Sequence, residues 1–153
     1  MSRRKAGQAR SPKARGAAAP TRPAFDPGAA CPCGRDGQPY QDCCGRFHRG
    51  DAPAPTAERL MRSRYAAFVV GDADYLLRTW HPDTRPAHLD LDPRTRWLGL
   101  DVVAATEGGP FHNEGTVTFR AHYRESGHDG VIEEHSSFTR VDGAWVYAAA
   151  LGE

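Results

Sequence analysis

Four cysteines stand within fourteen residues of this 153-residue chain, and the chain contains no other. Cys31 and Cys33 flank a single proline, and Cys43 and Cys44 follow after a loop of nine residues. Thiols this dense usually form disulfides or bind a metal ion. Glycines between the two pairs allow the tight turns that a metal knuckle needs. The spacing predicts a small Zn²⁺ site, and four thiolate ligands would leave no open position, which is typical of a structural site.

His48 is a further candidate ligand. Cys43 and Cys44 are adjacent, and neighbouring side chains diverge along a chain, so His48, four residues after Cys44, could replace one of them. We favour ligation by all four cysteines, with His48 as the substitute. The alternative is that the cysteines are reduced and unliganded, left over from an ancestral site.

The composition argues against a membrane or secreted protein. No apolar run approaches the roughly 18 residues that a membrane helix requires. The basic cluster Arg3-Arg4-Lys5 is not followed by the apolar segment of an export signal. We therefore expect a cytoplasmic protein without membrane contact. Thiols stay reduced in that compartment, which favours metal over disulfides.

Residues 1–30 read as a disordered tail, rich in Ala, Pro, Gly and Arg. They carry seven basic residues and one acid, Asp26, whereas the whole chain has a net charge of +1, so the remainder is net acidic. We favour a solvated tail or a misassigned start. The alternative is a weak nucleic-acid contact through this segment.

A first helix is expected up to Val70. Thr56 suits its N-cap and Gly71 its end. Met61, Tyr65 and Phe68 fall on one face at helical spacing, as on a helix packed against a core.

A second helix is expected after Asp72, its N-cap, with Tyr75 and Trp80 among its apolar residues and His81-Pro82 at its end. Residues 83–95 then form a linker or one short helical turn.

The period changes to that of strands after residue 96. Turns are expected at 127–130 and 141–143. Four strands are expected at 97–103 (with a bulge at Gly99), 116–124, 131–140 and 145–147. Two helices followed by four antiparallel strands predict an α+β fold, with the sheet curled around its helices as a cone.

A pocket inside this cone would be lined from both layers. Glu134 and Ser136 share the strand face of apolar neighbours and are expected to point inward. Arg64 borders the apolar face of the first helix, where it either pairs with Glu134 or extends to solvent. Tyr65, Asp74 and Trp80 are further candidates for the lining, although such aromatic residues more often belong to a core.

These residues resemble two known patterns. Cys-Pro-Cys-Gly leading to Tyr-x-x-Cys-Cys resembles the SEC-C motif, named for the zinc-binding tail of the bacterial preprotein translocation ATPase. Residues 60–68, 71–76, 79–82 and 97–100 resemble the bacterial YchJ family. The resemblance implies a zinc knuckle at 31–50 and a nuclear-transport-factor-2-like cone at 56–150, in a family with no established activity.

The chain departs from those patterns in three ways. Its loop between the cysteine pairs has nine residues where the SEC-C motif usually has eight, and most of the usual basic residues there are absent. The second departure weakens any role in binding an acidic partner. No second SEC-C motif precedes Glu153.

Three functions follow as hypotheses. The preferred one is a non-enzymatic adaptor whose metal knuckle stiffens a docking surface for an unidentified protein partner. The second is a small-molecule-binding protein or an isomerase- or dehydratase-like enzyme, and it requires a sizeable cavity that reaches Glu134. The third is nucleic-acid association through residues 1–30. A homodimer is compatible with each of them.

Overall fold

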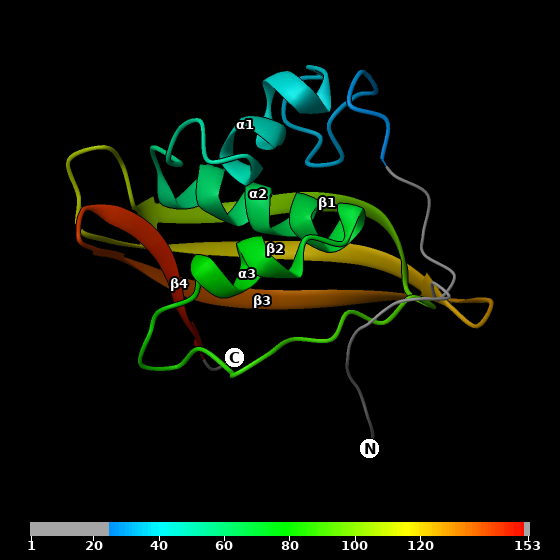
Figure 1. Ribbon diagram of the computed structural model, residues 1–153. Helices are drawn as coiled ribbons and strands as arrows, with labels where there is room; N and C mark the ends of the chain where they lie inside the picture. Colours follow the sequence, from blue (N-terminus) through cyan, green and yellow to red (C-terminus); the bar gives the residue numbers. More distant parts are fainter. Residues whose placement is uncertain (1–24, 152–153) are drawn as a thin grey trace.

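The computed structural model describes residues 25–151 (Figure 1), so most of the predicted disordered tail, residues 1–24, lies outside the described residues. Helical elements come first and strands follow. The helical elements are a 3-10 turn at Tyr40–Asp42, α1 at Cys44–His48, α2 at Ala57–Val70 and α3 at Ala73–Arg78. The strands are β1 at Arg96–Glu107, β2 at Glu114–Glu125, β3 at His128–Val141 and β4 at Ala144–Leu151. The predicted α+β order is confirmed.

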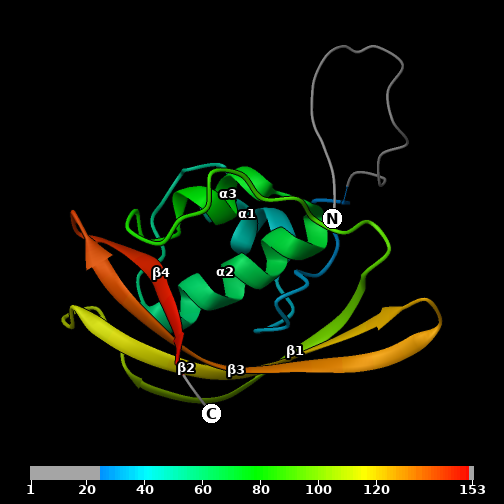
Figure 2. The same ribbon diagram turned by 90° about the horizontal axis from the view of Figure 1, so that it is seen from below.

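The four strands form one antiparallel sheet in the order β1-β2-β3-β4. Figure 2 shows that the sheet is strongly curved and that α2 lies across its concave side. The register shifts between Trp97 and Gly99, where a bulge was predicted, and also between Val102 and Ala104. Such irregularities bend a strand and increase its twist. They allow β1 to follow the curve around α2.

Two tight hairpin turns connect β2 to β3 and β3 to β4. Asp142 and Gly143 join β3 to β4 with φ angles of 53° and 85°, as in the turn predicted there. Ser126 and Gly127 join β2 to β3 with φ angles of 54° and 79°. This turn lies earlier than the predicted 127–130, because residues 128–130 already pair with β2.

The bounds of α2 agree with its predicted caps. The Thr56 hydroxyl accepts a hydrogen bond from the Arg59 amide at 3.1 Å, and Gly71 adopts the left-handed conformation at φ 86°. Glycine takes that conformation without a side-chain clash. No helix within residues 25–151 is long and apolar enough to cross a membrane.

The second helix is shorter than predicted. Asp72 caps α3 as expected, with its carboxylate 3.0 Å from the Tyr75 amide, but α3 ends at Arg78. Trp80 instead forms an isolated parallel bridge with Tyr147 of β4. Residues 83–95 contain hydrogen-bonded turns but no helix. The pairing with β4 draws the chain out of the helix, and propensity alone does not reveal this contact.

α2 has three apolar contacts. Its residues Leu60, Met61 and Tyr65 pack against the sheet, together with Val117, Ala121, Phe138 and Trp145. Ala66 lies against the four cysteines. Ala67 lies in a third cluster with Phe47, Tyr75 and Leu76. α2 therefore joins the sheet, the cysteine knuckle and α3 into one core.

Candidate metal centre and ligand cavity

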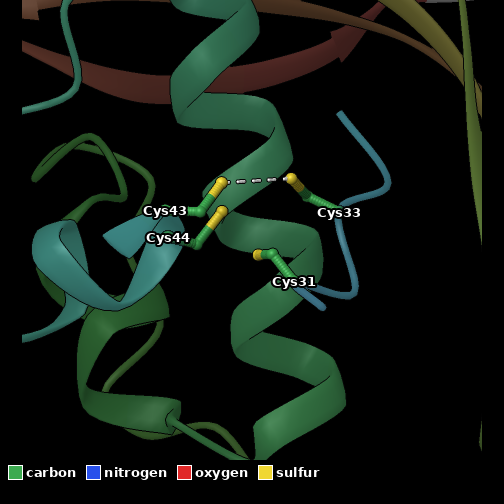
Figure 3. Close-up of side chains that lie close together, drawn as sticks. All are labelled: Cys31, Cys33, Cys43 and Cys44. Atoms are coloured by element: carbon green, nitrogen blue, oxygen red, sulfur yellow. Dashed lines mark hydrogen bonds between the residues drawn. The ribbon is translucent and has the colours of Figure 1, made fainter. Parts of the chain in front are cut away.

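The four cysteine sulfurs converge on one point (Figure 3). All four Sγ atoms lie within 4.8 Å of one another, and all four side chains are buried. The Sγ atoms of Cys33 and Cys43 are 3.7 Å apart. Tetrahedral zinc with Zn–S bonds of about 2.3 Å places its sulfurs about 3.8 Å apart. The cysteines form no disulfide, so the set fits a tetrahedral metal ion.

The backbone explains how adjacent cysteines both reach this point. Cys43 has φ −115° and ψ −111°, neither helical nor extended, and Cys44 is the first residue of α1. The chain thus turns between the two thiols, and both point toward Cys31 and Cys33. Gly45 permits the tight turn, because a Cβ there would lie 2.7 Å from the Tyr40 carbonyl oxygen.

The electrostatics of the cluster favour a cation. Hydrogen bonds from the Cys33 and Cys44 thiols lower the pKa of Cys31 to about 4. Hydrogen bonds to Cys31 and Cys33, together with burial, raise the pKa of Cys44 above its ordinary value. One thiolate is therefore stabilised by the neighbouring thiols, whereas further thiolates need a positive counter-charge.

His48, the predicted substitute ligand, lies outside the four-sulfur group. Its Nε2 lies 2.9 Å from the Ser63 carbonyl oxygen, and its Nδ1 lies 2.5 Å from the Tyr40 hydroxyl. A carbonyl can only accept, so Nε2 carries the proton and Nδ1 accepts from Tyr40. Burial lowers the pKa of His48, which keeps the ring neutral in this arrangement.

Hydrogen bonds fasten the knuckle to the helices. Arg62 of α2 donates to the Cys33 carbonyl at 2.8 Å, and Arg78 of α3 donates to the His48 carbonyl at 2.8 Å. Residues 25–30, predicted as part of the tail, also lie against the knuckle. Phe25 packs edge-on against Tyr40 with a ring-centroid distance of 5.3 Å, and Ala30 forms a bridge with Pro39. Residues 25–30 are therefore part of the folded structure, contrary to their assignment to a disordered tail.

A cavity of about 520 Å³ opens between α2, residues 89–95 and the concave face of the sheet. Of the predicted pocket residues, Arg64, Tyr65, Trp80, Glu134 and Ser136 line it. Asp74 does not, because it is exposed in the first turn of α3. Eight of the twenty lining residues are aromatic: Tyr65, Phe68, Trp80, Trp97, Phe119, Tyr123, Phe138 and Tyr147.

Polar groups meet at one end of this cavity. Oε2 of Glu134 accepts hydrogen bonds from Ser136 Oγ at 2.6 Å and from the Tyr147 hydroxyl at 3.0 Å. Arg64 donates through Nη1 to the Leu76 carbonyl and to Thr79 Oγ1, both at 2.8 Å.

The predicted Arg64–Glu134 ion pair does not form among the described residues. Tyr147 contacts both groups instead, with its ring centroid 4.8 Å from Arg64 Cζ and its hydroxyl donating to Glu134. Burial lowers the pKa of Arg64 to about 10, with a partial offset from Tyr147, Tyr75 and Glu134. Arg64 therefore remains charged at neutral pH.

The sequence did not reveal several lining residues. Trp97 and Tyr123 contact each other at a centroid distance of 5.9 Å, and Leu89 and Leu91 complete the mouth. The strand expected at 116–124 contains Tyr123, but nothing in the sequence marks this residue as part of a pocket. For residues 89–95 there was no periodic signal.

Comparisons with known proteins agree with this architecture. The family model of the YchJ middle NTF2-like domain matches residues 56–150. A UPF0225 protein of Streptomyces coelicolor is 65% identical over 118 residues, which cover 77% of this chain and 91% of the relative. A UPF0225 protein of Corynebacterium glutamicum is 53% identical over 121 residues, covering 79% and 95%. Neither name states an activity.

Two solved structures are also similar. A SEC-C motif containing protein from Rhodopseudomonas palustris has a TM-score of 0.70 and 34% identity, covering 81% of this chain and 98% of its own. A SEC-C motif containing protein from Psychrobacter arcticus has a TM-score of 0.66 and 28% identity, covering 81% and 84%. The likeness therefore extends over the knuckle and the sheet together.

Proposed function

This chain belongs to the YchJ family, and from that premise we propose that it binds a small molecule in its curved sheet, with a structural zinc ion in its four-cysteine knuckle. The cavity that reaches Glu134 carries the proposal. Its volume of about 520 Å³ lies within the roughly 300–1,000 Å³ of small-molecule sites. Its aromatic wall and few convergent polar groups are also typical of such sites.

The zinc assignment follows from the ligand chemistry. Four buried sulfurs within 4.8 Å of one another form the soft, closed donor set that is typical of structural zinc sites. Cys31, Cys33, Cys43 and Cys44 would hold the ion, which would supply the positive charge that the thiolates require. Native mass spectrometry on protein purified without chelator tests this. We expect one zinc per chain in the wild type and none in Cys43→Ser; a wild type without metal would contradict it.

The cavity supports ligand binding and does not test the adaptor role. A collapsed interior would have removed the small-molecule hypothesis, and the interior is not collapsed. The adaptor role, a protein partner, a homodimer, a cytoplasmic location and nucleic-acid contact through residues 1–30 stay predictions, since no observation bears on them.

Binding can be tested with the uncharged dye Nile red and two matched variants of β3. Ile132 lines the cavity and Val131 does not, yet both are partly exposed, at 42% and 52%. Ile132→Trp should fill the mouth of the cavity and weaken dye binding about tenfold or more, a loss of about 1.4 kcal/mol. Val131→Trp should bind as the wild type does. Absence of binding to the wild type, or equal effects of both variants, would refute the proposal.

A further inference from the structure

The Arg64 guanidinium has donors that the protein does not use. Among the described residues, only its Nη1 makes hydrogen bonds, so Nε and Nη2 have no acceptor. Nε and Nη2 of Arg64 are nevertheless accessible. In the described part of the chain, the only side-chain nitrogens or oxygens that are both fully buried and without a hydrogen-bond partner belong to Arg46 and Arg59. Because Arg64 lines the cavity, its free donors are available to a ligand there.

Glu134 offers the complementary group. Both of its hydrogen bonds from the protein arrive at Oε2, and no described residue donates to Oε1. Ser136 and Tyr147 fix the orientation of the carboxylate, which also lines the cavity. Oε1 is therefore a positioned acceptor without a donor.

The donor and the acceptor are neighbours of opposite charge. Tyr147 contacts both, with its ring over Arg64 and its hydroxyl on Glu134. A ligand group that accepts from one and donates to the other satisfies both and adds no charge. A carboxylate would accept from Arg64 but would face the negative Oε1, and an ammonium would meet the converse difficulty.

Acidic residues at the mouth of the cavity further restrict the charge of the ligand. Asp90, Asp92 and Glu125 lie along its lining. Arg94 pairs with Asp92 at 3.1 Å, and Thr95 donates to Glu125 at 3.1 Å. Glu125 has no arginine or lysine within ion-pair distance in residues 25–151, and Asp90 lies 3.4 Å from His88 only. Four carboxylates line the cavity against one arginine, so the lining is net acidic. Anionic ligands such as phosphates are disfavoured there.

The walls determine the shape of the ligand. Trp97 packs against Tyr65, Phe68 and Tyr123 with centroid distances of 6.0, 5.7 and 5.9 Å. Such a wall of rings suits a flat aromatic partner, which stacks or packs edge-on.

We propose that the cavity binds an uncharged, planar aromatic molecule whose amide-like edge places an acceptor on Arg64 and a donor on Oε1 of Glu134. This ligand class rests on the proposed function. An amide-like edge, as in a carboxamide or a lactam, carries both groups side by side without net charge.

Three probes on one scaffold test the ligand class by isothermal titration calorimetry of the full chain at pH 7.5. They are naphthalene-2-carboxamide, naphthalene-2-carboxylate and naphthalen-2-ylmethylammonium. The carboxamide should bind at least about tenfold more tightly than either ion. Equal or tighter binding of one of the ions would overturn the proposal.

A charge-neutralising variant of Glu134 tests its role, and the same substitution at Glu133 is the control. In Glu134→Gln the side-chain oxygen can still accept from Ser136 and Tyr147, while the amide nitrogen replaces Oε1 and becomes a donor. The preference should then shift at least about tenfold toward the carboxylate. Glu133→Gln, its neighbour with a side chain on the outer face beside Arg120, should leave the preference unchanged. An unchanged preference in Glu134→Gln would overturn the assignment.

The outcomes separate the two proposals. If Nile red binds but the three probes show no preference or do not bind, the ligand class is wrong and the binding cavity stands. If neither Nile red nor any of the three probes binds, both proposals are wrong.

Discussion

The knuckle and the cavity lie against neighbouring faces of the same helix, α2, and they treat their polar groups in opposite ways. In the knuckle, four thiols point at one another. His48 uses both of its ring nitrogens within the protein. In the cavity, Arg64 and Glu134 each make hydrogen bonds to the protein with one atom, Nη1 and Oε2, and their other polar atoms remain available to a ligand. The first region is closed on itself and the second is incomplete without a ligand.

The difference assigns separate tasks to the two regions. A closed donor set has no position for a substrate, so it contributes stability. Positioned polar groups without partners are costly to a fold and are typical of binding sites. The predictions below test this separation, from the largest expected effect to the smallest.

Removal of the metal should have the largest effect. Structural zinc contributes about 10–16 kcal/mol in small zinc domains, so chelation should lower the Tm by roughly 10 °C or more. Differential scanning calorimetry with and without a strong chelator checks this. Cys33→Ser should start at the lower Tm and not respond to the chelator. A wild type that is indifferent to chelation would contradict the structural role.

Crowding the interface between α2 and the knuckle should have the next largest effect. Ala66 is fully buried against the cysteines, so Ala66→Leu should destabilise the protein by about 1–3 kcal/mol and weaken zinc retention. The measurements are urea unfolding and zinc content. Ala104→Leu on the exposed part of β1 is the matched control. Equal behaviour of the two variants would mean that the knuckle does not depend on its contact with α2.

The stability should fall in mild acid through His48. Burial lowers its pKa in the folded protein, with Tyr40, Tyr75, Asp72 and Arg78 around it. In the unfolded chain the pKa of histidine is about 6.5, so the unfolded state takes up the proton first. The stability that neutral His48 contributes is therefore fully present above about pH 6.5. It is lost as the pH falls toward the lowered pKa of His48 in the folded protein.

Urea unfolding between pH 7.5 and pH 5.5 measures this loss. His48→Gln should lose less unfolding free energy over that interval than the wild type. Both proteins contain the same thiolates, so subtracting one pH profile from the other removes the contribution of the thiolates. Parallel pH profiles for the two proteins would show that His48 is not the titrating group.

The outer face of the sheet should be the least sensitive region. Arg120 and Glu133 pair at 3.4 Å with about half of each side chain exposed. Such pairs contribute little because water screens them, so Glu133→Gln should change the unfolding free energy by at most about 0.5 kcal/mol. Urea unfolding checks the value. A change above 1.5 kcal/mol would mean that this face is not simply solvated.

Local chemistry made some elements predictable from the sequence. Thr56 and Gly71 set the ends of α2 through contacts within a few residues, and Asp142-Gly143 specifies its hairpin turn in the same way. The metal cluster was also visible, because its four ligands stand close together in the chain.

Contacts between distant residues could not be predicted. Trp80 leaves α3 because of Tyr147, a partner 67 positions later. The same tyrosine contacts both Arg64 and Glu134, and no periodicity in the sequence indicates contacts between positions so far apart. The mouth of the cavity comes from a loop with no regular structure, and the loop's position depends on the whole fold.

An NMR titration tests the central claim most directly, namely that the knuckle is closed and the cavity is open. The uniformly ¹⁵N-labelled, zinc-loaded chain would be titrated with naphthalene-2-carboxamide. We predict that the largest shifts occur at the indole N–H groups of Trp80 and Trp97 and at the β3 amides around Glu134, with the amides of residues 31–48 unmoved. Shifts centred on residues 31–48, with the two indoles unmoved, would contradict the account.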